Sequence, residues 1–124
     1  MYIKRLNGCQ TSGVTDQESN DLDKAICLLR QLLESEGRVA KDELVIIIGA
    51  SGGRFDQEMA TLHCLHKWRG NFLRIILLNE VSLTFLLESN QKHQLEIMKG
   101  IEGPTCGLIP LAGRADSVTT TGFI

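Results

Sequence analysis

Hydrophobic residues recur every three or four positions after Asn20, and this spacing predicts an amphipathic helix. The apolar positions are Leu22, Ala25, Ile26, Leu29, Leu32 and Leu33. Asn20 is a suitable N-cap, because its side chain can accept a hydrogen bond from the first turn. Gly37 is a suitable stop, because glycine adopts the backbone conformation that often ends a helix. The pattern therefore predicts a helix over residues 21–35.

Residues 44–48 form an uninterrupted aliphatic run, which is typical of a strand that is buried on both faces of a parallel sheet, and the largely aliphatic run at residues 73–78 predicts another buried strand. A further strand is expected over residues 81–87, after a short polar break. Between the first two runs, apolar residues at loose helical spacing predict a second helix. These are Met59, Leu62, Leu65 and Trp68. The alternation of helices and strands favours an α/β fold with a partial parallel sheet and flanking helices.

The pattern changes at about residues 88–92. From there on no helical period is visible, Leu95 and Ile97 alternate with polar residues, and glycines separate short segments. This predicts the beginning of an all-β domain, with no helix after about residue 92. We therefore divide the chain into residues 1–90 and residues 91–124. Residues 1–15 show no period and are expected to form a loop or a frayed entry to the fold.

The composition is that of a folded globular protein, with 43% hydrophobic and 23% charged residues. The net charge of -2 offers no basic surface, so we expect neither nucleic acid nor a membrane as a partner. The longest apolar runs are also too short to span a bilayer. The four cysteines are widely spread with no C-x-x-C pair, which argues against a zinc or disulfide framework and favours a reducing, cytoplasmic location.

Four acids surround the predicted start of the first helix: Asp16, Glu18, Asp21 and Asp23. Carboxylates can hold Mg²⁺, a hard cation that prefers oxygen ligands and often bridges to substrate phosphates. The alternative is that Asp21 and Asp23 only interact with the helix dipole, since acids are common in a first turn. Lys24 favours the first interpretation, because a cation there is unfavourable for the dipole but suits a bound phosphate.

The aliphatic run at residues 44–48 leads directly into a glycine-rich loop, Gly49-Ala50-Ser51-Gly52-Gly53-Arg54, which the second predicted helix follows. Backbone N–H groups at such a junction can bind an anion, and Arg54 can add a bidentate contact to a phosphate. The spacing fits neither the dinucleotide fingerprint nor the Walker loop. The alternative is an ordinary turn between strand and helix, with Asp56 as the N-cap and Arg54 solvated.

Taken in order, four clusters resemble motifs of the thiamine pyrophosphokinase family. They are Asp16-Gln17 with Asp21 and Lys24, Gly49-x-x-Gly52-Gly53-Arg54-Phe55-Asp56-Gln57, Gly103-x-x-Cys106-Gly107-Leu108-Ile109-Pro110, and Thr119-Thr120-Thr121-Gly122. The resemblance implies an α/β catalytic domain followed by a thiamine-binding β-sandwich, and a homodimer that binds thiamine between its subunits. It also implies an enzyme that transfers pyrophosphate from ATP to thiamine, giving thiamine diphosphate and AMP, with Mg²⁺ as cofactor.

The resemblance further implies roles for individual residues. Asp21 is the expected magnesium ligand, and Gln17 and Lys24 are expected near the triphosphate. All three are counted among the catalytic residues.

The glycine-rich loop is the second place to which the resemblance assigns roles. Gly52 and Gly53 are expected to bind phosphate together with Arg54. Arg54 and Asp56 are expected to hold the pyrophosphate and thiamine, and both are counted as catalytic. The thiamine-facing positions are Asp56, Thr120 and Thr121.

Some positions depart from the family pattern. Glu18 replaces an aspartate, Asn20 replaces a threonine, and no counterpart of an upstream Asp-x-Asp-Ser motif is present. A Lys-Trp pair after the threonines is replaced by Phe123-Ile124. We therefore expect a fragment that lacks the N-terminal part of the catalytic domain and most of the sandwich, with impaired turnover. The alternatives are a non-catalytic remnant that binds nucleotide weakly or pairs with full-length subunits, and an unrelated phosphate-binding α/β domain.

Overall fold

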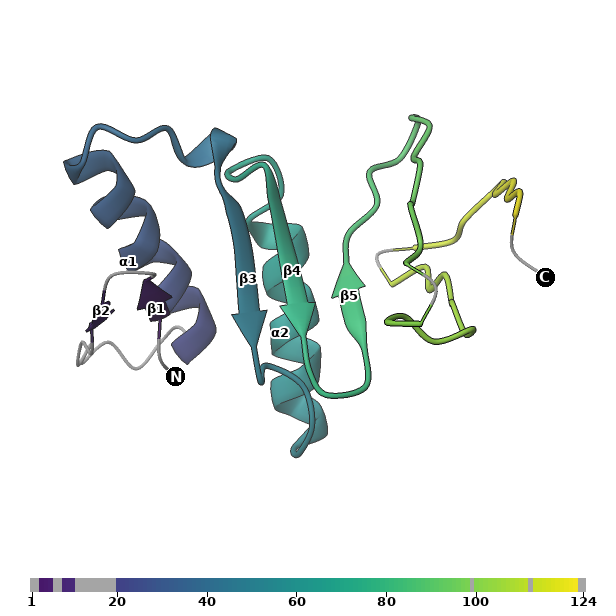
Figure 1. Ribbon diagram of the computed structural model, residues 1–124, viewed down its shortest axis with the longest axis horizontal. Helices are drawn as coiled ribbons and strands as arrows, with labels where there is room; N and C mark the ends of the chain where they lie inside the picture. Colours follow the sequence, from purple (N-terminus) through teal and green to yellow (C-terminus); the bar gives the residue numbers. More distant parts are fainter. Residues whose placement is uncertain (1–2, 6–7, 11–19, 99, 112, 123–124) are drawn as a thin grey trace. The chain divides into compact units, whose positions relative to one another are not determined.

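The structure is a computed structural model that describes residues 3–5, 8–10, 20–98, 100–111 and 113–122 (Figure 1). Contacts within the chain divide it into two units, Met1–Ser89 and Asn90–Ile124. Within the described residues, every helix and strand belongs to the first unit. Neither of its α-helices is long and apolar enough to cross a membrane.

Helix α1 spans Asp21–Ser35, so the helix predicted from the apolar spacing is confirmed. The side chain of Asn20 accepts a hydrogen bond from the backbone N–H of Asp23 at 2.8 Å, as expected of an N-cap. Beyond the other end, Gly37 has φ 70°, a left-handed conformation that glycine adopts without strain. The local capping residues therefore set both ends of this helix.

The sheet of the first unit contains three strands in the order β3, β4, β5. Strand β3 (Leu44–Ile48) follows a short 3₁₀-helix (Ala40–Asp42) and pairs in parallel with β4 (Arg74–Leu78). Helix α2 (Phe55–Lys67) forms the crossover between these two strands. The predicted parallel pair and the predicted second helix are confirmed.

Strand β5 (Leu83–Phe85) pairs with β4 in the antiparallel direction, so the sheet is mixed. It is shorter than the strand expected over residues 81–87. The chain reverses just before it, where the side chain of Asn79 accepts hydrogen bonds from the backbone N–H groups of Val81 and Ser82 at 2.9 and 2.6 Å. This tight turn allows only an antiparallel neighbour, because a parallel one needs a long crossover.

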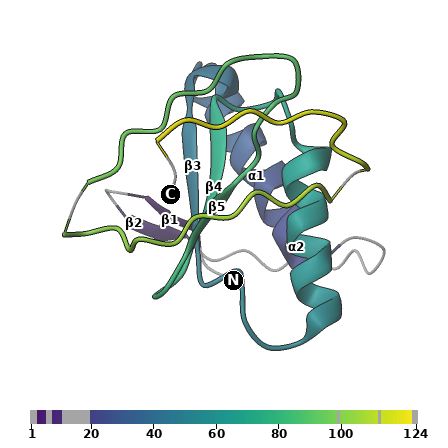
Figure 2. The same cartoon turned by 90° about the vertical axis from the view of Figure 1, so that its right-hand side faces the viewer.

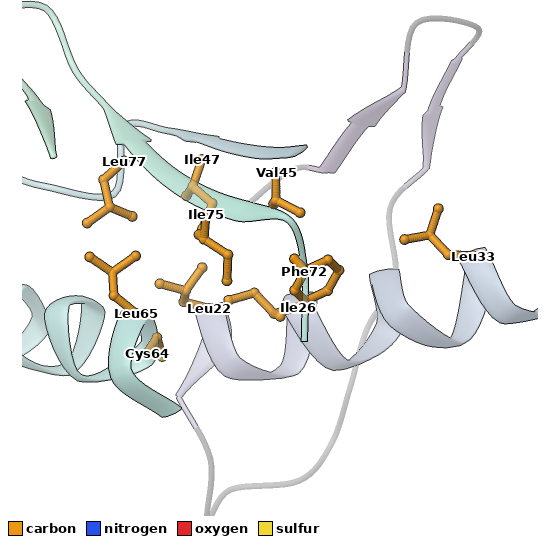
Figure 3. Close-up of a cluster of buried hydrophobic side chains, with 10 residues drawn as sticks. All are labelled: Leu22, Ile26, Leu33, Val45, Ile47, Cys64, Leu65, Phe72, Ile75 and Leu77. Carbon is orange, nitrogen blue, oxygen red and sulfur yellow. The ribbon is translucent and has the colours of Figure 1, made fainter. Parts of the chain in front are cut away.

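The hydrophobic core lies between the two helices and one face of the sheet. Figure 2 shows α1 and α2 on the same side of the three strands, and Figure 3 shows the core side chains between them. The buried residues are Leu22, Ile26, Leu33, Val45, Ile47, Cys64, Leu65, Phe72, Ile75 and Leu77. Removal of this apolar surface from water is the main force that holds the unit together.

The prediction that residues 44–48 are buried on both faces is wrong for the described structure. Val45 and Ile47 are buried, but Leu44, Ile46 and Ile48 are 52%, 52% and 77% exposed. The reason is that both helices cover the same face of the sheet. An aliphatic run without alternation is thus half exposed.

The expectation of a loop over residues 1–15 is also wrong in part. Strands β1 (Ile3–Arg5) and β2 (Gly8–Gln10) form a small antiparallel hairpin, in which Ile3 is paired with Gln10. Strands of three residues are too short to show a period of two in the sequence, so the pattern carried no signal for them.

The described part of the second unit contains no helix, as predicted. It also contains no strand ladder, only turns and a single bridge residue at Glu102. Glycines with positive φ mark several of its turns: Gly100, Gly113 and Gly122. An extended segment becomes a strand only when a neighbour supplies its hydrogen bonds, so the sequence pattern of a strand does not by itself produce one.

The one-sided core predicts different effects for two neighbouring isoleucines of β3. Ile47→Ala should lower the free energy of unfolding by about 2–5 kcal/mol, because it removes buried methyl groups and leaves a cavity. Ile48→Ala is the matched control and should cost less than about 1 kcal/mol. Urea unfolding followed by circular dichroism measures both. Equal losses would show that the outer face of β3 is covered in solution.

Candidate functional site

The loop between β3 and α2 depends on glycines with left-handed backbone conformations. Gly49, Gly52 and Gly53 have φ values of 74°, 98° and 103°. Apart from the glycine itself and its two chain neighbours, no atom lies within 4 Å of the position that a Cβ would occupy at any of them. Glycine is therefore required at these positions by the backbone conformation, and not by a lack of space for a side chain. The open space above the loop leaves its backbone accessible to a ligand.

This loop is attached to the end of the neighbouring strand. The backbone N–H of Gly49 donates to the carbonyl oxygen of Leu78 at 3.1 Å. The side-chain amide of Asn79 donates to the hydroxyl oxygen of Ser51 at 2.5 Å. The loop thus lies at the carboxyl ends of β3 and β4, which is where open α/β sheets usually bind ligands.

Two carboxylates from the first turn of α2 already accept hydrogen bonds from donors of the loop. The backbone N–H of Gly52 donates to Oε1 of Glu58 at 2.6 Å. The guanidinium of Arg54 forms a two-point contact with Asp56, with Nε–Oδ1 at 3.0 Å and Nη2–Oδ2 at 2.5 Å. An incoming phosphate would have to compete with both carboxylates for these donors.

The Arg54–Asp56 pair changes the sequence interpretation of both residues. The hydrogen bond from Arg54 lowers the pKa of the Asp56 carboxyl, and the same contact raises the pKa of Arg54. Both side chains are exposed, at 75% and 60%. The alternative with Asp56 as N-cap is wrong, because Arg54 itself stands at the N-cap position, without a side-chain cap.

The second group of expected site residues lies at the start of α1. Asp21 is exposed and Lys24 half-buried, and their spacing of three residues places them on the same face of the helix. Neither side chain forms a hydrogen bond or ion pair with another described residue. Gln17 lies outside the described residues.

The described residues supply only part of a metal site. They contain no group of three or more histidine, cysteine, aspartate or glutamate side chains that could hold a metal ion. Mg²⁺ is usually held by one or two carboxylates together with water and substrate phosphates. The exposed carboxylate of Asp21 therefore fits Mg²⁺ only in combination with phosphate oxygens.

No hydrogen bond or ion pair between described residues joins the two groups of candidate residues. Asn20, next to Asp21, donates from its side-chain amide to the sulfur of Cys64 at 3.6 Å. Cys64 lies ten residues after Arg54, which is about 15 Å along a helix. Thr120 and Thr121 belong to the second unit, where both are exposed.

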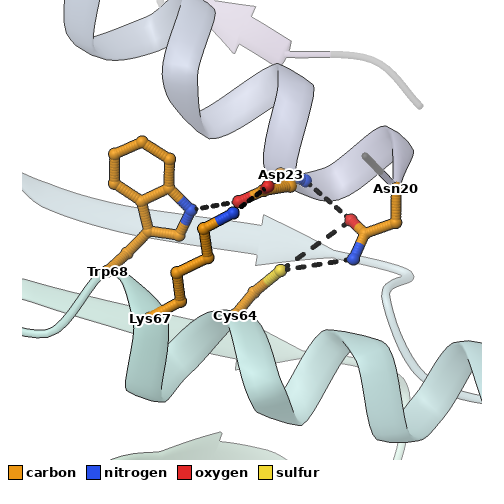
Figure 4. Close-up of polar contacts among 5 residues, drawn as sticks. All are labelled: Asn20, Asp23, Cys64, Lys67 and Trp68. Carbon is orange, nitrogen blue, oxygen red and sulfur yellow. Dashed lines mark hydrogen bonds and ion pairs between the residues drawn. The ribbon is translucent and has the colours of Figure 1, made fainter. Parts of the chain in front are cut away.

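Asp23 has a role that the sequence did not predict (Figure 4). It is only 8% exposed, and its carboxylate accepts a hydrogen bond from the indole Nε1–H of Trp68 at 2.6 Å and forms an ion pair with Lys67. Both donors come from the end of α2 and the residue that follows it. The apolar spacing of the helix did not separate Asp23 from Asp21, so no signal in the sequence could have found this contact.

The contacts of Asp23 determine its protonation. Burial acts to raise the pKa of this carboxyl, but the hydrogen bonds from Lys67 and Trp68 and the charge of Lys67 together outweigh burial, so the pKa lies below its ordinary value. The same hydrogen bond raises the pKa of Lys67. At neutral pH the pair is therefore fully charged.

A glycine-rich loop between a parallel strand and a helix, with an arginine at the start of that helix, is typical of α/β domains that bind phosphate groups. The family model described as "Thiamin pyrophosphokinase, catalytic domain" matches residues 2–77. The model described as "Thiamin pyrophosphokinase, vitamin B1 binding domain" matches residues 92–124. The chain belongs to the thiamin pyrophosphokinase family.

Several curated relatives are similar to this chain over most of its length. Thiamine pyrophosphokinase 3 of Oryza sativa subsp. japonica is 42% identical over 109 residues, which cover 87% of this chain and 39% of the relative. Thiamine pyrophosphokinase 2 of the same species is 35% identical over 125 residues, covering 98% and 45%. Thiamine pyrophosphokinase 1 of Arabidopsis thaliana is 36% identical over 108 residues, covering 87% and 39%. The chain thus spans less than half the length of these relatives.

The buried carboxylate predicts a pH-dependent loss of stability. Asp23→Asn should lower the free energy of unfolding at pH 7 by about 1.5–3 kcal/mol, because a charged hydrogen-bond acceptor is lost. The folded-state pKa of Asp23 lies below its ordinary value of 3.8, so its ionised form favours the folded state above that pH. This contribution disappears as the pH falls through the folded-state pKa, and the difference between wild type and variant should then vanish.

Urea unfolding at pH 7, 5 and 3 measures this difference. Asp21→Asn is the matched control, because it also removes an acid from the first turn of α1 but breaks no contact with another described residue. Its effect should stay within about 0.5–1 kcal/mol, the usual size of an interaction with the helix dipole. A difference for Asp23→Asn that is unchanged at pH 3 would contradict the assignment of the ion pair.

Proposed function

We propose that this chain serves the transfer of pyrophosphate from ATP to thiamine, giving thiamine diphosphate and AMP. The observation that carries the proposal is the match of a catalytic-domain model and a vitamin B1-binding model, in that order, to residues 2–77 and 92–124. The names of the relatives and the open glycine loop at the carboxyl ends of β3 and β4 support it.

The protein can promote this reaction by positioning the two substrates and by neutralising the charge of the phosphate groups. The thiamine hydroxyl attacks the β-phosphorus of ATP and forms a P–O bond, while the bond from that phosphorus to the oxygen shared with the α-phosphate breaks and AMP leaves. Mg²⁺, when bound, neutralises charge on the phosphate oxygens. No covalent intermediate on the protein is needed.

We assign phosphate binding to the loop. The backbone N–H groups of Gly52 and Gly53 and the guanidinium of Arg54 take the phosphate oxygens, in exchange for the carboxylates of Glu58 and Asp56. The two-point geometry that Arg54 already uses with Asp56 is the geometry that suits two phosphate oxygens. Asp56, released from Arg54, is then available to the thiamine side.

At the start of α1, Asp21 is assigned as the magnesium ligand and Lys24 as a contact of the triphosphate. The exposed Asp21 carboxylate and the position of Lys24 on the same face support this. Gln17 is assigned to the triphosphate on the motif order alone. Thr120 and Thr121 are assigned to thiamine, and their position in the stretch matched by the vitamin B1-binding model supports this.

We also infer the coarser organisation of the protein. Residues 1–90 belong to the catalytic domain and residues 91–124 to the thiamine-binding domain, a division supported by the two units of the structure. A homodimer and a cytoplasmic location complete the proposal. The wide spacing of the cysteines in the sequence supports a reducing location.

Purified chain, mixed with ATP, Mg²⁺ and thiamine, should form AMP and thiamine diphosphate slowly, well below the usual enzyme rate of about 10 per second. The reason is a shortage of magnesium ligands. Among the described residues at the start of α1, Asp21 is the one carboxylate whose oxygens are not engaged by another described residue, and the sequence contains no Asp-x-Asp-Ser motif. Chromatography of the nucleotides and of thiamine diphosphate measures the products. Formation of ADP in place of AMP would contradict pyrophosphate transfer.

A second candidate, nucleotide binding without turnover, is favoured by the same incomplete metal site. Binding of ATP with no thiamine-dependent AMP at any protein concentration would support it over catalysis. Thiamine-dependent AMP at ordinary enzyme rates would exclude it, and would show that the chain contains a sufficient metal site.

Arg54 offers a direct test of the phosphate loop. Arg54→Ala should weaken ATP binding by about ten- to a hundredfold, because a charge-assisted two-point contact is lost. Arg54→Lys should weaken it nearly as much, because lysine keeps the charge but lacks the planar pair of donors. Calorimetric titration with ATP measures the affinities.

The chain contains a matched control for this experiment. Arg114 forms the same kind of exposed pair with an aspartate two residues later, Asp116, at 2.9 Å. Arg114→Ala should leave ATP affinity within about twofold, as expected of a surface substitution. Equal affinities for the Arg54 and Arg114 variants would remove Arg54 from the site.

A further inference from the structure

The first turn of α1 presents acids on two different sides of the helix. Asp23 faces inward and is buried, while Asp21 is exposed. With 3.6 residues per turn, Asp21 lies about 160° around the helix from Asp23, and Lys24 lies about 60° from Asp21. The rotation of the helix that buries Asp23 therefore turns Asp21 and Lys24 outward together.

The hydrogen bonds of Asp23 depend on direction, whereas the packing of its apolar neighbours does not. Both carboxylate oxygens accept hydrogen bonds from the end of α2, one from Trp68 and one from Lys67. Apolar burial turns the apolar face of α1 toward the core but fixes the rotation only coarsely, because it depends on area and not on the direction of single contacts. A buried carboxylate with two fixed donors favours a single rotation, which is the best-attested use of buried charged groups.

Trp68 holds α1 at a second point. Its ring lies 5.7 Å from the guanidinium carbon of Arg30 and 6.4 Å from the ring of Phe72. Asp23 and Arg30 are seven residues apart, which is about two turns and places them on the same face of α1. Two contacts at different heights on one face resist both rotation and sliding of the helix.

We propose that Asp23 is a positioning residue for the metal and phosphate contacts of α1. By its bonds to Lys67 and Trp68, it holds the first turn in the rotation that presents Asp21 and Lys24 side by side to Mg²⁺ and a triphosphate. Asp23 is not itself a metal ligand, because both of its oxygens are engaged by α2. This inference rests on the proposed function, since it needs a nucleotide that binds with Mg²⁺.

The test compares ATP affinity with Mg²⁺ and with EDTA in the full 124-residue chain. In the wild type, Mg²⁺ should strengthen ATP binding through Asp21. The double variant Asp23→Leu with Lys67→Met replaces the buried carboxylate and its exposed partner by apolar side chains and leaves no buried charge unpaired, so it should fold. The Mg²⁺ enhancement should fall by about tenfold, the usual effect of removing a group that orients a ligand. The affinity measured in EDTA should fall by less, because only the contact of Lys24 with the triphosphate is weakened there.

Trp68→Phe, which keeps a ring but removes the indole donor, should lose part of the same enhancement. Arg38→Met is the control, because it breaks a different contact, the ion pair of Arg38 with Glu43, and should change neither affinity. Circular dichroism melting confirms that each variant is folded.

Each outcome bears on a different statement. A fall of the affinity with Mg²⁺ that is larger than the fall in EDTA supports the positioning role. An equal fall of both affinities, or an unchanged enhancement, overturns it and leaves Asp23 a purely structural residue. Wild-type binding without any Mg²⁺ enhancement also overturns it. Absence of ATP binding by the wild type in both conditions overturns the proposed function itself, and the inference with it.

Discussion

The parallel pairing of β3 with β4 is the constraint on which the rest of the first unit depends. Parallel strands cannot be joined by a tight turn, so the chain between them has to cross over the sheet, and α2 forms this crossover. The same pairing places the glycine loop at the carboxyl ends of both strands, where Gly49 is bonded to Leu78. The core between α2 and the sheet and the position of the candidate site therefore have one geometric origin.

The candidate phosphate loop already binds carboxylates of its own chain. Glu58 accepts a hydrogen bond from the Gly52 N–H, and Asp56 accepts from the guanidinium of Arg54. Exposed ion pairs contribute little net stability because water solvates both partners well. A polyphosphate, with more charge than one carboxylate, can therefore displace them. On the proposed function, phosphate binding at this loop would be an exchange of anions, and its strength would be the difference between two sets of contacts.

Asp21 and Asp23 show how position around a helix separates two identical side chains. Both lie in the first turn of α1, where an acid is favourable for the dipole. One faces solvent and keeps its oxygens available, and the other faces α2 and is bonded to Lys67 and Trp68. Composition and spacing could not distinguish them, because the difference depends on which face of the helix is covered.

The sequence by itself determined the elements whose causes are local. Apolar spacing and the cap at Asn20 located α1, aliphatic runs located β3 and β4, and the glycines between β3 and α2 marked the candidate loop. The Arg54–Asp56 pair, two residues apart, could have been found in the same way. Only the tertiary structure decided that both helices cover one face of the sheet, and that Asp23 meets donors 44 and 45 residues later in the chain. Such contacts depend on how whole elements pack, which no local period of hydrophobic residues encodes.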